Sequence, residues 1–140
     1  MALIAVVDDL FFAVKIRETA RQIGVVVDVV GAAKFQASLR THATEGSVEA
    51  VILDLNSAAA LEVIRRLKGE EQTRSLPLVG FASHVAADVI AAARAAGCDQ
   101  VLARSVFTKQ LAELLRSLAQ GPGIGGQEAG RTPLRASTEI

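Results

Sequence analysis

Short apolar runs alternate along this chain with segments in which apolar residues recur at helical spacing. The apolar runs have the length and continuous hydrophobicity of strands that are covered on both faces. We therefore expect strands at residues 3–7, 25–30, 50–55, 78–82 and 101–103. The helical spacing predicts helices over about 12–23, 33–42, 61–67, 85–96 and 111–118.

This regular order of strand and helix restricts the fold class to α/β. Strands that are each followed by a helix form a parallel sheet with helices on both faces. Because crossovers between parallel strands are right-handed, we expect a doubly wound fold with three layers. Five strands match the flavodoxin-like order 2-1-3-4-5, in which strands 1 and 3 are neighbours.

The composition shifts at Gly121 and divides the chain into two segments. Residues 1–120 carry the predicted strands and helices and are expected to form one domain. Residues 121–140 hold five of the 11 glycines and two of the three prolines, and they show no apolar period. We expect a flexible tail there.

The charge balance, the cysteine content and the length of the apolar runs exclude several classes of function. The 15 basic and 15 acidic side chains balance, whereas a nucleic-acid-binding domain usually carries a basic excess. Cys98 is the single cysteine, so the chain forms no internal disulfide. No apolar run reaches the roughly 18 residues of a membrane helix. We expect a cytoplasmic protein that binds neither nucleic acid nor membrane.

Acidic residues gather where two predicted neighbouring strands end. Asp8 and Asp9 follow the first strand, and Asp54 stands in the same place on the third. In this topology ligands bind at the carboxyl ends of the strands where the winding reverses, here between strands 1 and 3. Three converging carboxylates repel one another, and a hard cation such as Mg²⁺ removes that repulsion. The alternative is that Asp8 and Asp9 only cap the following helix.

These residues resemble the receiver domains of response regulators in two-component signalling. The resemblance covers about residues 2–119. It rests on the leucine-rich last helix and on the segments 6–9, 52–56, 76–79 and 95–99. It implies a phosphoprotein of a phosphorelay that interacts with other proteins and is not an enzyme.

The resemblance also assigns roles to the acidic residues. In receiver domains the Asp of the third strand accepts a phosphoryl group from a histidine kinase, so Asp54 is implied as the phosphoacceptor. Mg²⁺ is the implied cofactor, with Asp9 and Asp54 as direct ligands, Asp8 acting mostly through water, and Asn56 contributing its backbone carbonyl. The chemistry is sound because a carboxylate is a competent acceptor and a cation offsets the charge on the transferring group.

Residues at the phosphoryl-sensing positions depart from the family pattern. Receivers place Thr or Ser where this chain has Ala82, and Ser83 should point elsewhere because side chains alternate along a strand. Arg104 replaces a Lys and Ser105 the Pro after it, and Arg is not equivalent to Lys at a phosphate. The loop 57–60 is about two residues shorter than usual. The pattern resembles an atypical receiver, or pseudo-receiver, with an altered switch.

Three functions stay open at this point. The first is a single-domain receiver that depends on Mg²⁺ and partners a histidine kinase or another signalling protein. The second is an interaction module of the same fold that works without phosphorylation. The third is a small phosphotransfer or hydrolytic enzyme that uses the acidic crevice.

Two further expectations concern surfaces around the predicted crevice. Two interpretations of the alanine-rich helix 85–96 stay open. Its alanines reflect helix propensity alone, or they allow close approach of a partner, in which case this helix, the strand 101–103 and the last helix form the surface for a homodimer. We interpret Ser83 and His84 as the start of the helix 85–96, with Ser83 as its N-cap, rather than as a catalytic pair.

Overall fold

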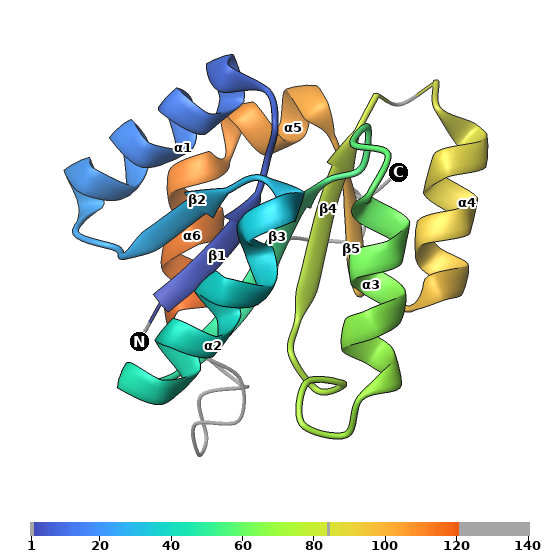
Figure 1. Ribbon diagram of the computed structural model, residues 1–140. Coiled ribbons are helices and arrows are strands. Elements are labelled where there is room, and N and C mark those ends of the chain that lie inside the picture. Colours follow the sequence, from blue (N-terminus) through green and yellow to red (C-terminus); the bar gives the residue numbers. More distant parts are fainter. Residues whose placement is uncertain (1, 84, 121–140) are drawn as a thin grey trace.

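The computed structural model describes residues 2–83 and 85–120 of the chain, and Figure 1 shows how its elements are arranged. Five parallel strands form one sheet in the order β2-β1-β3-β4-β5, which confirms the predicted topology. The strands are β1 (Ala2–Val6), β2 (Val27–Val30), β3 (Val48–Asp54), β4 (Leu78–Ala82) and β5 (Gln100–Ala103). His84 and the expected tail at 121–140 lie outside the described residues.

Helices cover both faces of the sheet, as the three-layer prediction requires (Figure 1). One face packs against α1 (Leu10–Ile23), α5 (Arg104–Lys109) and α6 (Leu111–Ala119). The other packs against α2 (Phe35–Glu45), α3 (Ala60–Gly69) and α4 (Ala87–Ala96). A short 3₁₀ helix, η1 (Ala32–Lys34), precedes α2. No helix within the described residues is long and apolar enough to cross a membrane.

Alternation along the strands divides the interior into two cores. In β1, Leu3 and Ala5 belong to the core beneath α1 and α6, whereas Ile4 and Val6 belong to the core beneath α3 and α4. All four side chains are buried. The two cores explain why the strand sequences are continuously apolar rather than alternating.

Helix α5 was not predicted. It has only six residues, too few for helical periodicity to show. It is held by Phe107, which is fully buried and stacks on Phe81 with 4.1 Å between ring centroids. Because Phe107 belongs to the core beneath α1 and α6, its side of the helix faces inward and the opposite side faces solvent.

The start predicted for α4 was also wrong. Ala86 has ψ 62, outside the helical region, and the helix begins at Ala87. The Ser83 hydroxyl accepts a 3.4 Å hydrogen bond from the N–H of Val85. Ser83 therefore closes a local turn and is not the N-cap.

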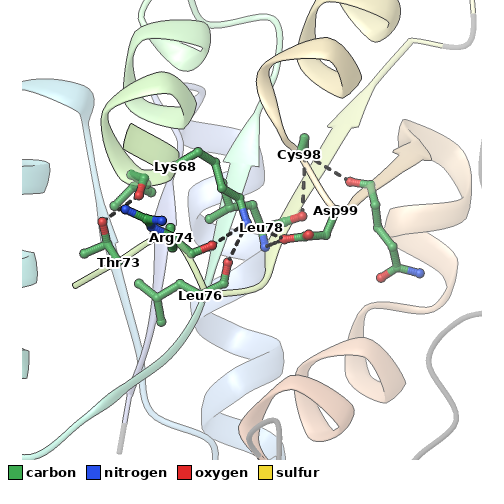
Figure 2. A network of polar contacts seen from close by, with 9 residues as sticks. Lys68, Thr73, Arg74, Leu76, Leu78, Cys98 and Asp99 are labelled. Atoms are coloured by element: carbon green, nitrogen blue, oxygen red, sulfur yellow. Dashed lines mark hydrogen bonds and ion pairs between the residues drawn. The ribbon is translucent and has the colours of Figure 1, made fainter. Parts of the chain in front are cut away.

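A polar network ties together the amino ends of β4 and β5 (Figure 2). The Asp99 carboxylate accepts hydrogen bonds from the N–H of Leu78 at 2.7 Å and from Lys68 Nζ at 3.2 Å. Lys68 Nζ also donates to the carbonyls of Arg74 and Leu76, at 3.0 and 3.3 Å. The loop between α3 and β4 is thereby fixed to the start of the next strand, at the end of the sheet away from the acidic residues.

Candidate functional site

Three acidic residues lie where the strand order of the sheet reverses. Asp54 is the last residue of β3, and Asp8 and Asp9 follow β1 closely. The register pairs Val6 with Leu53, so the two strands end side by side. Asp54 is 4% exposed, whereas Asp8 and Asp9 are exposed. The structure therefore places all three at the expected edge, with one of them buried.

Asp54 is shielded from solvent, and its neighbours offset its negative charge only in part. Its Oδ1 accepts a 3.0 Å hydrogen bond from the N–H of Asn56 and lies 3.7 Å from Nη2 of Arg104. Burial raises the pKa of the Asp54 carboxyl above its usual 3.8. The Asn56 N–H and the Arg104 charge oppose this rise in pKa, while the Asp9 and Asp8 charges add to it. Asp54 is thus a carboxylate whose charge calls for a cationic partner.

Arg104 provides part of that positive charge. It begins α5, and its guanidinium lies over the ring of Phe12 in α1, 4.8 Å from the ring centroid. Such stacking is favourable and holds the guanidinium plane in one orientation. The role of Phe12 was not predicted, because its place in the apolar stripe of α1 indicated only a core residue.

Asp9 and Asp8 already have partners within the chain. Asp9 caps α1, since its Oδ1 accepts hydrogen bonds from the N–H groups of Phe11 and Phe12 at 2.8 and 3.3 Å. Oδ2 of Asp8 accepts a 3.0 Å hydrogen bond from the hydroxyl of Ser57, in the loop after β3. The capping alternative is therefore what the structure shows for Asp9.

The acidic residues come less close together than the sequence led us to expect. Within 2–83 and 85–120, no three His, Cys, Asp or Glu side chains lie close enough together to hold a metal ion. The donor chemistry nevertheless suits a hard cation, because carboxylate and carbonyl oxygens are what Mg²⁺ takes. Both cap bonds of Asp9 are made to the same oxygen, Oδ1.

The expected switch positions differ in exposure. Ala82 is fully buried in the core beneath α3 and α4, opposite Ala103 of β5. Ser83 and Ser105 line an open groove beside Arg104. The structure thus places Arg104 next to Asp54, and it places Ala82 in an apolar setting.

Comparisons with known proteins find likeness in structure rather than in sequence. No family model matches the chain, and no curated protein is similar to it. The signal receiver domain of a signal transduction histidine kinase from Syntrophus aciditrophicus superposes with a TM-score of 0.70 at 16% identity, over 88% of this chain and 92% of that one. The chemotaxis response regulator CheY4 of Vibrio cholerae gives 0.67 at 15% identity, over 84% and 97%.

A further match is the isolated REC domain of RcsB from Salmonella enterica serovar Typhimurium, with a TM-score of 0.62 and 18% identity over 98% of this chain and 94% of that one. At identities of 15–18% the likeness concerns the fold. By strand order, layers and superposition, this chain has the fold of a response-regulator receiver domain.

Proposed function

We propose that this chain is a receiver in phosphorelay signal transduction and that Asp54 accepts the phosphoryl group from a histidine kinase. The observation that carries the proposal is the setting of Asp54. Within the described residues it is the only buried acidic side chain, and it stands at the strand-order reversal with a guanidinium 3.7 Å away.

The transfer is a displacement at phosphorus. A carboxylate oxygen of Asp54 attacks the phosphohistidine, the O–P bond forms as the P–N bond breaks, and the leaving imidazole nitrogen takes up a proton. The Asn56 N–H holds Oδ1 of Asp54 and so orients the carboxylate. Arg104 is positioned to pair with the phosphoryl oxygens, and burial of Asp54 limits the access of water to the acyl phosphate.

Mg²⁺ is the proposed cofactor. Asp9, Asp54 and the backbone carbonyl of Asn56 would hold it, with Asp8 acting through water. When bound, the cation supplies positive charge that offsets the charge of the transferring group. The hydrogen bond from Ser57 to Asp8 competes with this arrangement.

A magnesium titration followed by backbone NMR tests the metal site. We expect saturable shifts at Asp9, Asp54 and Asn56 in the millimolar range, and we expect Asp54→Asn to abolish them. Shifts that are unchanged in the variant would place the ion elsewhere.

Phosphorylation itself is tested by intact mass after treatment with acetyl phosphate and Mg²⁺. We expect the mass of one phosphoryl group to be added to the wild type and none to Asp54→Asn. Equal labelling of the two proteins, or no labelling of either, would contradict Asp54 as the acceptor.

We further propose that the response to phosphorylation is weak. A modification shifts an equilibrium only by the contacts it gains in one state over the other. Ala82 offers no hydroxyl, and a hydrogen bond to a charged group contributes roughly 1.5–3 kcal/mol. Arg104 is held by Phe12 and is bulkier than Lys, and Ser105 replaces the usual Pro.

The comparison of Ala82→Thr with Ala82→Val tests this altered switch. Both variants add similar volume at a fully buried position, but only Thr adds a hydroxyl. With beryllofluoride in place of the phosphoryl group, we expect NMR shifts across α4 and β5 to grow in the Thr variant alone. An equal response of both variants and the wild type would show that the switch does not depend on this hydroxyl.

The partnered state of Asp8 and Asp9 also supports the second candidate, an interaction module that works without phosphorylation. In that case α4, β5 and α6 form the proposed partner or homodimer surface. Exposed alanines at 87, 91 and 95 follow one side of α4 and would allow close approach of another helix. Absence of labelling at Asp54 together with retained self-association or partner binding favours this function over the first.

A further inference from the structure

A groove of about 670 Å³ opens beside Arg104, on the side of α5 that faces solvent. Its lining comes from the residue that follows β4 and from α5; each lining residue carries a polar group, while most of the lining surface is apolar. The lining residues are Ser83, Arg104, Ser105, Thr108 and Lys109. Its volume lies within the range of sites that take small molecules.

The spacing of these residues explains why they share one surface. Residues three and four apart lie on the same side of a helix, so Arg104 neighbours Thr108, and Ser105 neighbours both Thr108 and Lys109. Phe107 lies between them in sequence but is fully buried against Phe81. The buried ring therefore fixes the polar side of α5 toward the groove.

The lining has the chemistry of a site for an oxyanion. It contains two cations and three hydroxyls, and no carboxylate lines it. In the described part of the chain Lys109 has no ion-pair partner, and Nε of Arg104 is buried without a hydrogen-bond partner. Asp54 approaches Arg104 at 3.7 Å but does not line the groove.

We propose that this groove binds the phosphate group of a small phosphomonoester, reversibly and without transfer to Asp54. Arg104 supplies a forked pair of donors, Lys109 a second positive charge, and the hydroxyls of Ser105 and Thr108 further donors. A tetrahedral dianion uses more of these donors than a carboxylate does. The groove is larger than one phosphate, which leaves room for the organic part of the ligand.

Asp54 is expected to oppose ligand binding in this groove. The Asp54 carboxylate and the phosphate of the ligand both interact with the positive charge of Arg104, so the carboxylate weakens the binding of the ligand. Asp54→Asn should therefore leave phosphomonoester binding intact or strengthen it. The proposal does not depend on whether Asp54 is phosphorylated, and the acetyl phosphate experiment measures that property separately.

The test is an NMR titration of the full chain with phenyl phosphate at constant ionic strength. We expect saturable shifts at Ser105, Thr108 and Lys109. Lys109→Gln should weaken binding about three- to fivefold, as for an exposed ion pair, and Thr108→Val tests the hydroxyl at nearly constant volume. Lys34→Gln is the matched control, because Lys34 is also an exposed lysine but lies near the opposite edge of the sheet.

Four outcomes would overturn the proposal. They are the absence of saturable shifts, an equal loss of affinity in Lys34→Gln, loss of binding in Asp54→Asn, and much tighter binding of a phosphoserine peptide than of phenyl phosphate. The first two outcomes would mean that phosphate is attracted to surface cations in general and has no site in the groove. The third places the ligand at the acidic residues, and the fourth makes the partner a protein rather than a small molecule.

Discussion

Replacing Gly80 by Ala tests how closely β4 packs against the residue that follows Asp54. A Cβ built at Gly80 would lie 2.7 Å from Cδ1, 2.8 Å from Cγ and 2.9 Å from Cδ2 of Leu55. Favourable carbon contacts begin at roughly 3.5 Å. Leu55 is buried, and its N–H donates to the carbonyl of Phe81 at 3.0 Å, so its backbone cannot easily withdraw.

The expected cost follows from two opposing effects. Forcing an extra methyl into a packed core costs about 1–3 kcal/mol. Replacing Gly by Ala returns about 0.4–1 kcal/mol, because the unfolded chain loses freedom. We therefore expect Gly80→Ala to lower the free energy of unfolding by about 1–2 kcal/mol. The amide resonance of Asn56 should shift as well, since Leu55 directly precedes it.

Urea unfolding of a double-mutant cycle separates the steric conflict from other effects. Leu55→Ala alone should cost about 2–5 kcal/mol by opening a cavity. In the double variant the new methyl enters that space, so the two costs should not add, with a coupling of about 1 kcal/mol or more. Gly69→Ala is the control, because a Cβ there meets nothing within 4 Å. Additive costs, or a neutral Gly80→Ala, would refute the packing argument.

Three further predictions concern titratable groups. Burial raises the folded pKa of Asp54 above 3.8, so the ionised carboxylate lowers the stability of the protein at neutral pH, and this loss disappears as the pH falls through the folded pKa. Urea unfolding should therefore find Asp54→Asn more stable than the wild type at pH 7, with a stability that depends less on pH. Asp28 behaves oppositely, because hydrogen bonds from Ser38 and His42 lower its pKa. Its contribution to stability is present above pH 3.8 and is lost as the pH falls through the lowered folded pKa, so Asp28→Asn should be less stable than the wild type at neutral pH. Burial raises the pKa of Cys98 to about 11, and we expect its thiol to react with iodoacetamide at pH 8 only after urea unfolds the protein.

The sequence was sufficient for the topology because both faces of the sheet are buried. Continuous apolar strands alternating with helices allow few arrangements, and the order β2-β1-β3-β4-β5 followed from general rules. Helix α5 was not predicted because six residues show too little periodicity, and because its buried residue, Phe107, packs against residues distant in the sequence, such as Phe81.

The site was predicted in position but not in detail. An Asp that follows a strand and precedes a helix can cap the helix or bind a cation, and both roles have the same sequence pattern. The role of Asp9 therefore became clear only from the hydrogen bonds in the structure. The stacking of Arg104 on Phe12 joins α5 to α1, and no local pattern predicts a contact between such distant segments. Packing across elements decides these details, whereas periodicity describes one element at a time.

The two strands at the margins of the sheet have a consequence for behaviour at high concentration. An edge strand exposes unpaired backbone groups that can recruit another chain into an extended sheet. Here β2 and β5 each have only four residues, and the more apolar β1, β3 and β4 lie inside. β2 also carries the charged Asp28, to which side chains of α2 are bonded. Edge-to-edge pairing between copies would gain few hydrogen bonds and, at β2, would bury a charge, so the fold itself protects the protein against β-aggregation.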